Sequence, residues 1–509
     1  MAKSRTIKFL QNAGGSALYQ IVNSLCGLIT PRIILQCYGS NLNGLVSSIT
    51  QFLSALAVVE AGLALASQQS LYKPLAERDY NKVSAVVSAA RTAYTHVGLL
   101  FTALTALLAV LYPVFTDVEE LNYIQIVLLV FILSMNYVLS FFVISKYQAL
   151  FQADQRVYVI SLSKAIARII NTIVIIAVSL VGAHILLMRT LAVSSLLIQA
   201  LIIWLYSKKH YPNIDYYAKP DKSALNQRWD AMYLQLLSAV TVSAPAILLT
   251  LISTLEEVSI YSIYNMVFSA LMGILGIFMS GINASFGEML NSKESDKTKG
   301  AYYEFENAYY ILISIVYLVT LIMVSPFVRI YTDGITDANY LLPGIGVLFT
   351  VNALLYNLKT PQGMMLQAAG LFKKTRLQNS IQMAILLIGG IVLGYFWGIY
   401  GVLVASILSN GYRCIDQMIF IPKVVLQDSP LKTFRRVLIM FALIILAYVP
   451  AKFLIDKMDI STFGMWIVFS ILATIYSSVV IVAGAFVFER NCMIQTARRI
   501  LGIFKRKKV

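Results

Sequence analysis

The sequence has few of the residues from which enzymes build active sites. Only 13% of its 509 residues are charged, against about 25% in ordinary soluble domains. Its three histidines and four cysteines are scattered and form no zinc-binding or disulfide pattern. Signatures for nucleotide binding, zinc proteases and dithiol chemistry are absent. We therefore expect a protein that is not an enzyme, with no catalytic residue, no metal site and no cofactor.

Long apolar runs take the place of these features. The chain is 59% hydrophobic with a mean hydropathy of +0.75, and a membrane-spanning helix needs roughly 20 apolar residues. We therefore expect an all-α polytopic membrane protein with about 14 transmembrane helices. The windows lie near 14–37, 43–70, 88–115, 121–145, 158–182, 185–207, 231–253, 258–287, 306–328, 339–366, 378–397, 399–422, 437–455 and 463–488.

The net charge of +16 follows the loops between these windows. If both termini are cytoplasmic, 30 of the 40 Lys and Arg residues fall on the inner side, three outside and seven within spans. This is the positive-inside bias of multi-pass proteins in a bacterial cytoplasmic membrane. The charge therefore indicates topology, and we expect no nucleic-acid partner. The basic tail at 489–509 is interpreted as a cytoplasmic segment that binds anionic membrane lipids.

The sequence also repeats itself at a constant offset. Three short matches have the same separation: Ser54-Ala55-Leu56 with Ser269-Ala270-Leu271, Ala93-Tyr94 with Ala308-Tyr309, and Gln152-Ala153 with Gln367-Ala368. Pro31 and Pro245, which we expect to bend their helices by freeing a backbone carbonyl, fall one position short of the same offset. Because a shift of six spans preserves orientation, the repeat predicts two parallel six-helix lobes around a V-shaped central cavity.

The repeat sets the expected division of the chain. We expect an N-lobe at 1–207 with helices 1–6 and a C-lobe at 231–422 with helices 7–12, joined by a cytoplasmic linker at 208–230. Two extra C-terminal helices at 423–488 have no counterpart in the repeat, and the basic tail at 489–509 follows them. The outer loops are too short to form a domain.

Seven cations fall within the predicted spans, against two acids. An arginine at depth costs at least about 3 kcal/mol on insertion scales, so it normally faces a cavity or a partner. Arg168 falls near mid-depth, and Arg32 and Arg189 fall at similar heights roughly 9 Å outward of it, at about 1.5 Å per residue. The seven are Arg32, Arg91, Lys164, Arg168, Arg189, Lys359 and Arg413. We expect Arg32, Arg168, Arg189, Lys359 and Arg91 to line a cationic, substrate-binding cavity.

Structural roles are open for several of these cations. Arg91 and Lys164 can extend along their spans to the inner interface. Arg189 can pair with a neighbouring side chain. Lys359 precedes Thr360-Pro361, where a helix would break, and either lines the cavity or marks that break.

The two acids within the spans are Glu60 and Asp416. Asp416 lies three residues after Arg413, a spacing at which opposite charges pair on a helix. Glu60 can titrate in an ion- or proton-coupling step, or it can neutralise Arg32 or Arg168. The sequence leaves coupling and charge pairing open for all three of Glu60, Asp416 and Arg413.

One stretch carries a resemblance to a known family. At 38–63, YGSNLNGLVSSITQFLSALAVVEAGL begins with a YG turn and ends in an acidic-Gly-Leu motif. This pattern resembles bacterial polysaccharide transporters, the lipid-linked oligosaccharide flippases of the multidrug/oligosaccharidyl-lipid/polysaccharide exporter superfamily. SLYKPLAERDYNKV at 70–83 and SKYQALFQADQRVYVIS at 145–161 resemble their inner segments, and the likeness covers about 420 residues.

The resemblance implies a flippase. Its substrate would be undecaprenyl diphosphate bearing an oligosaccharide repeat unit, moved from the inner to the outer leaflet by alternating access for O-antigen, capsule or exopolysaccharide assembly. A polysaccharide polymerase is then a possible partner. The family's cationic cavity residue on the first span corresponds to Arg32. Fourteen spans are also found in the lipid II flippase branch, although the second span here carries Glu60 and no arginine.

Other functions make different demands on the sequence. A cation-coupled multidrug exporter on the same fold needs buried acids to attract cationic drugs, whereas cations predominate in these spans. A lipid II flippase shares the diphosphate requirement. A membrane glycan polymerase or ligase needs an outer catalytic loop, and the predicted outer loops are short. The cationic cavity therefore favours the flippase for an anionic lipid.

Overall fold

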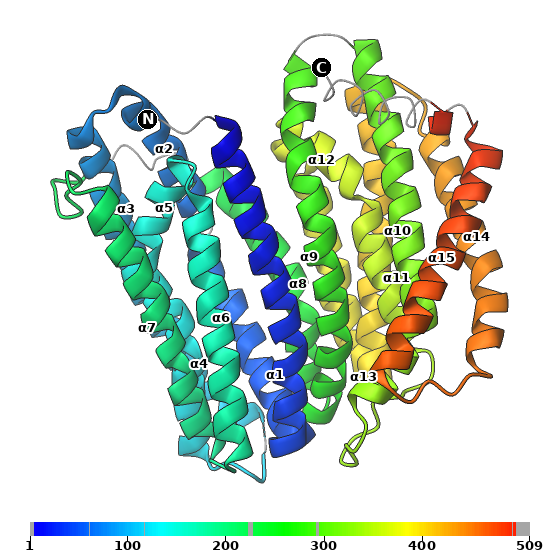
Figure 1. Cartoon of the computed structure of the whole chain (residues 1–509), viewed down its shortest axis with the longest axis horizontal. Helices are drawn as coiled ribbons and strands as arrows, with labels where there is room; N and C mark the ends of the chain where they lie inside the picture. The colour runs from blue at the N-terminus through cyan, green and yellow to red at the C-terminus, as the bar shows by residue number, and fades with distance from the viewer. Residues whose placement is uncertain are drawn as a thin grey trace. The chain divides into compact units, whose positions relative to one another are not determined.

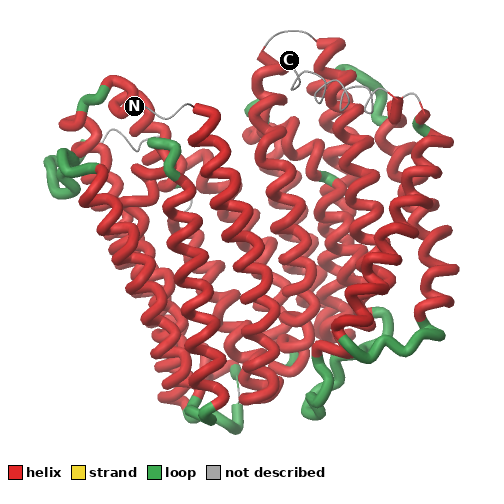
Figure 2. Tube along the Cα trace, in the orientation of Figure 1, coloured by secondary structure: helices red, strands yellow, loops and turns green. Residues whose placement is uncertain are grey.

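The structure is a computed structural model that describes residues 5–60, 62–116, 118–221, 228–291, 295–490 and 492–494. It describes the backbone alone at 5–9, 65, 228–235, 277–291, 295–297 and 372. Every regular element among these residues is a helix (Figure 2). The chain divides into two compact units, 1–266 and 267–509, and the boundary lies inside one helix. The lobe boundaries and the linker that the sequence indicates therefore stay predictions. Most of the predicted basic tail lies outside the described residues.

The first unit is built around its N-terminal helix (Figure 1). That helix, α1, packs along α6, which in turn packs along α7. The elements of this unit are α1 (Arg5–Leu56), η1 (Ala57–Glu60), α2 (Leu63–Glu77), α3 (Tyr80–Phe115), α4 (Tyr123–Leu139), the π-helical η2 (Ser140–Ile144), α5 (Ser145–Ala153), α6 (Val157–Leu180), α7 (Ile185–His210), α8 (Arg228–Ile252) and the first part of α9 (Leu255–Asn291).

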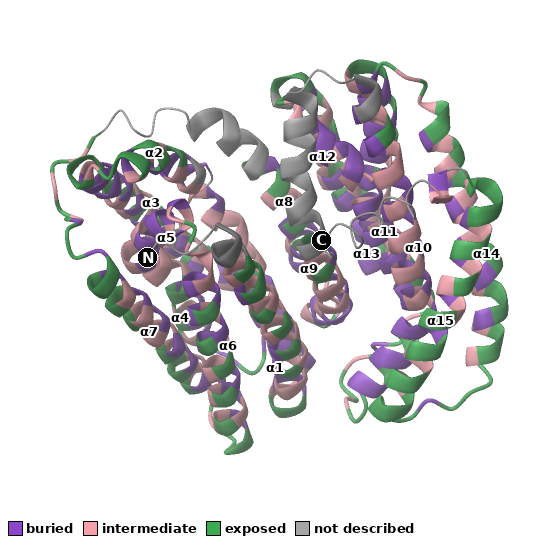
Figure 3. Cartoon of the chain, turned by 45° about the horizontal axis from the view of Figure 1, so that its top comes forward, coloured by how far each residue is buried: buried purple, intermediate pink, exposed green. Residues whose placement is uncertain are grey.

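The second unit contains the rest of α9 and the C-terminal helices. Helix α10 packs against α11, α14 and α15, and α11 packs against α13. The elements are α10 (Ser295–Tyr331), α11 (Ile345–Leu358), α12 (Thr360–Ala368), η4 (Phe372–Thr375), α13 (Arg376–Phe420), the π-helical η5 (Ile421–Leu426), α14 (Leu431–Ile455) and α15 (Phe463–Phe488). The outer faces of α14 and α15 expose apolar side chains such as Leu446 and Val479 (Figure 3).

Ten helical stretches are long and apolar enough to cross a membrane. Two of them, of 51 and 54 residues, are more than twice the length that a bilayer needs. Each contains a glycine with positive φ where two helices join, Gly39 (82°) in α1 and Gly398 (53°) in α13. Dividing these helices there gives twelve segments, and the shorter apolar stretch Leu236–Ile252 makes thirteen, close to the fourteen that the sequence predicts. The chain is a multi-pass membrane protein.

In the first unit, loops that are predicted to lie on the same side of the membrane contact one another. At one end, the Tyr38 hydroxyl donates to the carbonyl oxygen of Ala183 in the α6–α7 loop (2.8 Å), and Asn41 donates to Glu120 in the α3–α4 loop (3.4 Å). At the other end, Asn12 donates to the carbonyl oxygen of Gln155 in the α5–α6 turn (2.8 Å). The alternation of loops that the charge pattern predicts is therefore present in this unit.

The part of α1 that follows Gly39, its second arm, lies very close to α8 and α9. A Cβ atom on Gly44 would lie 1.9 Å from the carbonyl oxygen of Leu255, so glycine permits this approach. The Asn43 amide donates to Ser259 Oγ at 2.8 Å, and the hydroxyls of Ser48 and Thr250 are 2.6 Å apart. Small residues and buried polar contacts of this kind hold helices together within a membrane.

Helix boundaries follow the sequence repeat. Helix α5 runs from Ser145 to Ala153 and α12 from Thr360 to Ala368, so both ends are related by the same offset as the short sequence matches. Both helices follow a break in the preceding helix, the π-helical η2 in the first unit and Lys359 in the second. The repeat therefore extends from short sequence matches to the positions at which helices break.

The second unit buries a carboxylate at the edge of a predicted span. Glu306 on α10 is fully buried, and its Oε1 accepts hydrogen bonds from Tyr302, Gln362 and Thr433 at 2.9–3.0 Å. Its Oε2 lies 3.0 Å from Arg436 of α14. Because Arg436 also pairs with Glu489 at the end of α15 (3.3 Å), this network ties the two C-terminal helices to α10.

We predict that Arg436→Leu strongly destabilises the protein. The substitution leaves Glu306 buried without its cation, and removing one partner of a buried ion pair costs about 3–5 kcal/mol. Arg435→Leu is the matched control, since Arg435 is 65% exposed in its pair with Glu489 and such pairs contribute about 0–1 kcal/mol. Thermal unfolding of the detergent-solubilised protein measures both. Equal unfolding temperatures for the two variants would contradict this role for Glu306.

Candidate functional site

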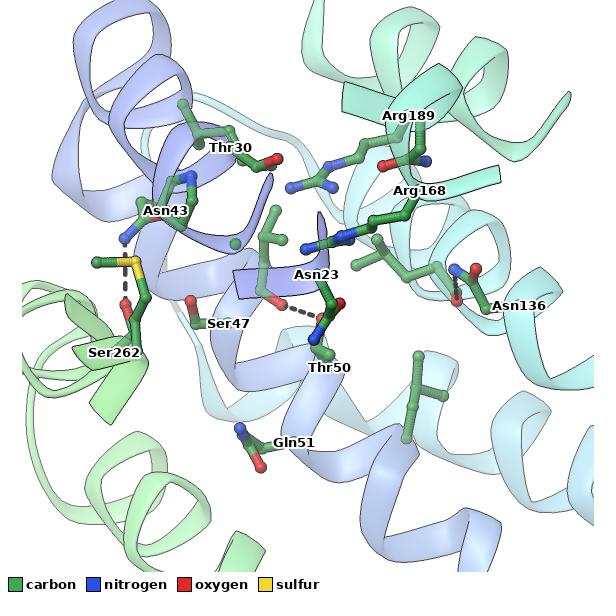
Figure 4. A pocket seen from close by; sticks show the side chains of 18 of the residues that line it. Asn23, Thr30, Asn43, Ser47, Thr50, Gln51, Asn136, Arg168, Arg189 and Ser262 are labelled. Atoms are coloured by element: carbon green, nitrogen blue, oxygen red, sulfur yellow. Dashed lines mark hydrogen bonds between the residues drawn. The ribbon is translucent and has the colours of Figure 1, made fainter. Parts of the chain in front are cut away.

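The first unit encloses a polar cavity of about 560 Å³ (Figure 4). This volume is within the range of small-molecule sites, about 300–1,000 Å³. Side chains from α1, α4, α6, α7, α8 and α9 line it. Its polar lining residues are Tyr19, Asn23, Thr30, Asn43, Ser47, Thr50, Gln51, Asn136, Tyr137, Lys164, Arg168, Asn171, Arg189, Ser195, Gln199, Tyr261, Ser262 and Asn265.

The lining residues lie on regular stripes of otherwise apolar helices. On α6 they are Lys164, Arg168 and Asn171, and on α1 they include Tyr19 and Asn23. Residues three or four positions apart share one face of an α-helix. The outer faces of the same helices expose apolar residues such as Ile166 and Ile173. The helices of this unit are therefore amphipathic, with the polar stripe turned to the cavity.

Arg168 of α6 and Arg189 of α7 extend into the cavity together (Figure 4). They are close enough for Arg168 to act electrostatically on Arg189. The Nε atom of each is buried and has no hydrogen-bond partner in the protein. Within the described part of the chain, neither guanidinium forms an ion pair. Two adjacent like charges without a counter-charge form an incomplete electrostatic arrangement, which an anion would complete.

The charge of the cavity has one sign. Lys164 adds a third cation on the α6 stripe, and no aspartate or glutamate is among the described residues that line the cavity. A cleft lined by charges of one sign and enclosed by low-dielectric walls concentrates ions of the opposite sign. The arrangement is therefore suited to an anionic ligand and unsuited to a cationic one.

Pro31 contributes to the cavity through the backbone. It lies within α1, which continues past it, and both Pro31 and Gly27 line the cavity. Proline has no N–H to donate to the carbonyl oxygen four residues earlier, so the carbonyl of Gly27 lacks its helical partner. Pro245 lies within α8 in the same way, next to the cavity-lining Ala246. Neither proline ends its helix.

The structure does not bring all the predicted cavity residues into this site. Arg32 follows the cavity-lining Pro31 but does not itself line the cavity. Arg91 of α3 stacks on the ring of Tyr217, 3.9 Å from its centroid, in the segment that follows α7. Arg168 and Arg189 do line the cavity, together with Lys164, for which the sequence left an interfacial position open.

Glu60 lies where the second span is interrupted. It ends the 3₁₀ turn η1, and Gly62 begins α2 with a φ of 80°. Its charged neighbour is Lys164 of the cavity wall. Glu60 is therefore near the cavity without lining it, and its coupling or charge-pairing role remains a prediction.

The remaining predicted residues lie in the second unit. Arg413 of α13 is buried and forms an ion pair with Asp416, three residues later. The Lys359 ammonium, between α11 and α12, donates to Asn410 Oδ1 at 2.8 Å and lies 4.9 Å from the centroid of the Tyr356 ring. These residues form polar contacts within their own unit.

The offset of the sequence repeat relates residues of the cavity wall to polar residues around Asn410 in the second unit. Tyr137, Ala167 and Ser195 line the cavity, and their counterparts at the offset of the repeat are Asn352, Gln382 and Asn410. Those three amides bond to one another, since Asn410 donates to Asn352 (2.9 Å) and accepts from Gln382 (3.4 Å). These three positions thus carry mutually bonded amides in the second unit, whereas their counterparts line an open cavity with two arginines in the first.

Sequence reasoning missed the neutral polar residues of the cavity. Seven carboxamide side chains line it, more than the three cations. They were not predicted because they carry no charge and the predicted cavity rests on charged residues. The sequence does contain a pattern that indicates them, namely amides that recur on one helix face within apolar runs, as with Asn43 and Gln51 at positions i and i+8 of α1. The seven are Asn23, Asn43, Gln51, Asn136, Asn171, Gln199 and Asn265.

Solved structures share the architecture of this chain. The lipid II flippase MurJ, in an inward closed conformation, matches with a TM-score of 0.66 at 13% identity, covering 94% of this chain and 99% of that one. A multidrug resistance MATE family transporter of the MOP superfamily, in an inward-facing conformation, matches with a TM-score of 0.62 at 14% identity, covering 80% and 93%. The chain has the MOP-superfamily transporter fold.

A third solved structure with this fold concerns pocket charge. It is a MOP superfamily transporter from Pyrococcus furiosus, whose binding pocket of reversed polarity is said to suggest a different function. It matches with a TM-score of 0.59 at 12% identity, covering 83% of this chain and 96% of that one. No family model and no curated protein matches the sequence. The comparisons establish the fold, and the cavity must indicate the substrate.

We predict that pyrophosphate binds this cavity and stabilises the protein against unfolding. Ligand at 100 times its Kd adds about 2.7 kcal/mol of stability. Arg168→Gln or Arg189→Gln should remove most of the rise in unfolding temperature, because each deletes a charged hydrogen-bond donor to the anion. Lys209→Gln, at an exposed position in the last turn of α7, is the control and should keep the full rise. An equal rise in all four proteins would show that pyrophosphate binds elsewhere.

Proposed function

We propose that this protein is a flippase for lipid-linked oligosaccharides carried on undecaprenyl diphosphate. It moves the repeat unit from the inner to the outer leaflet of the bacterial cytoplasmic membrane, by alternating access, for surface polysaccharide assembly. The observation that supports this proposal most directly is the pair of buried, unpartnered Nε atoms of Arg168 and Arg189 in a cavity whose described lining residues include no carboxylate. The transporter fold is consistent with the proposal, and the solved structures that share it are described as transporters and a flippase rather than enzymes.

A diphosphate matches the arginine pair in charge and in hydrogen-bond type. Guanidinium groups only donate, in a planar fork, and phosphate oxygens accept, so the two associate through strong charge-assisted bonds. The headgroup of the lipid loses its water when it enters the membrane interior, and fixed donors replace that hydration. The polyprenyl chain can stay in the surrounding hydrocarbon during this step.

The repeat and the proline positions support alternating access. Helix boundaries that recur at a constant offset indicate two related halves, and transporters with parallel repeats expose a site near the bilayer midplane alternately to each side. The predicted roles of Arg32, Arg91 and Lys359 in substrate binding remain proposals for other steps of this cycle. The predicted membrane orientation, with cytoplasmic termini, sets the direction from inner to outer leaflet.

Two other substrates use the same fold. A cation-coupled multidrug exporter would favour carboxylates in its cavity, and the described lining residues include none. Lipid II also carries a diphosphate, so the arginine pair suits it equally, and the solved lipid II flippase covers nearly the whole chain. The sugar part of the headgroup distinguishes lipid II from a polysaccharide repeat unit.

We predict that the purified protein in proteoliposomes translocates a fluorescent oligosaccharide on undecaprenyl diphosphate. Arg168→Gln and Arg189→Gln should each lower the rate by about 10- to 100-fold, the loss expected when one hydrogen bond to a charged group is removed. The measurement is the protection of labelled headgroups from an impermeant quencher over time.

Lys209→Gln again serves as the control and should translocate at the wild-type rate. Tetraphenylphosphonium uptake is measured in the same vesicles as the test of drug export. Uptake of this cation, without translocation of the labelled lipid, would contradict the flippase proposal and favour the exporter. Full translocation by both arginine variants would contradict the assigned site.

A further inference from the structure

Five polar side chains of the cavity have hydrogen-bonding capacity that the protein does not use. Asn23, Ser47, Gln51, Gln199 and Asn265 line the cavity and make no hydrogen bond to another described residue. Polar groups within a membrane are costly unless something satisfies them. They come from α1, α7 and α9, so the cavity offers neutral hydrogen-bonding groups in addition to the arginine pair.

Other amides in the same cavity are satisfied, which makes the contrast specific. Asn171 donates to the carbonyl oxygen of Ala192 at 3.0 Å, and Asn43 donates to Ser259 at 2.8 Å. These two amides connect neighbouring helices. The five side chains without a protein partner connect no helices within the described protein, so helix packing does not account for them.

The arginine pair and two of the neutral side chains come from different walls. Arg168 and Arg189 enter from α6 and α7, while Ser47 and Gln51, one helical turn apart on the second arm of α1, enter from the opposite side in Figure 4. Thr30, whose buried hydroxyl has no partner within the described protein, lies on α1 as well. The walls therefore differ in charge: α6 and α7 carry the cations together with the amides Asn171 and Gln199, whereas the described lining residues of the second arm of α1, the neutral wall, are all uncharged.

The chemistry of the walls differs in what each can bind. Arginine only donates, which suits a phosphate. A carboxamide offers both a donor and an acceptor, and a serine hydroxyl does the same, which suits ligand hydroxyl and acetamido groups that also do both. Sugars have such groups in high density, and a polyprenyl chain or an aromatic drug does not. The neutral wall is therefore matched to carbohydrate.

We propose that Ser47 and Gln51 form a subsite that hydrogen-bonds to the first sugars of the oligosaccharide while Arg168 and Arg189 bind the diphosphate. This inference rests on the proposed flippase function and adds where the headgroup's sugars lie. It identifies the second arm of α1 as a determinant of substrate specificity. The arginine pair then selects for diphosphate lipids as a class, and the neutral wall selects among them.

The test compares two probes on the full-length protein in nanodiscs. One is undecaprenyl diphosphate without sugar, and the other is the same lipid bearing a neutral trisaccharide. The double variant Ser47→Ala/Gln51→Leu should lower the affinity for the glycosylated lipid about tenfold, the loss of roughly two neutral hydrogen bonds, and change the affinity for the bare lipid less than about twofold. Arg168→Gln should weaken both lipids. Gln69→Leu, an exposed glutamine of α2, is the matched control.

The outcomes separate this inference from the function on which it rests. Equal losses for both lipids in the double variant, or no loss for either, would overturn the sugar subsite while leaving the flippase intact. Failure of the wild-type protein to bind either lipid would overturn the flippase proposal and the subsite with it. Ser47→Ala alone removes only one oxygen atom, so its smaller loss, seen with the glycosylated lipid only, supports the subsite if the double variant folds poorly.

Discussion

The cavity of the first unit depends on the charge of two guanidinium groups, and none of the described residues that line it is a carboxylate. Arg168 lies close enough to act electrostatically on Arg189, and the Nε of each is buried without a partner. No ion pair within the described protein offsets the repulsion between these like charges. An anion between the two groups removes this repulsion. Binding of an anion in this cavity therefore also supplies the negative charge that its described lining residues lack.

The two units differ in the partners of their buried polar and charged side chains. In the second unit, Glu306 has its cation Arg436, and Arg413 has its carboxylate Asp416. The amides at positions repeat-related to the cavity wall bond to one another. In the first unit, the corresponding wall is open and its cations are unpaired. Repeat-related positions thus carry mutually bonded amides in the second unit and line an open cavity with two arginines in the first.

The sequence predicts the fold better than it predicts the site. Apolar windows are long and unambiguous, so the helical segments, the membrane class and the repeat follow from them. Arg168 and Arg189, selected because charge is rare in the spans, line the cavity, and Arg32 is one position from the cavity-lining Pro31 on a helix whose successive residues are about 100° apart. The roles of all three in binding remain predictions. Glu306 stands at the first position of the predicted window 306–328, and its burial follows from α10 beginning earlier, at Ser295, which hydropathy does not give.

The most direct measurement is a cryo-electron microscopy structure of the protein with an undecaprenyl-diphosphate-linked oligosaccharide bound. We expect density for the two phosphates between the guanidinium groups of Arg168 and Arg189, within about 3 Å of their nitrogen atoms, as in charge-assisted hydrogen bonds. Phosphate density elsewhere, with these two arginines paired to carboxylates or turned toward the lipid, would contradict the assignment of the diphosphate to this arginine pair.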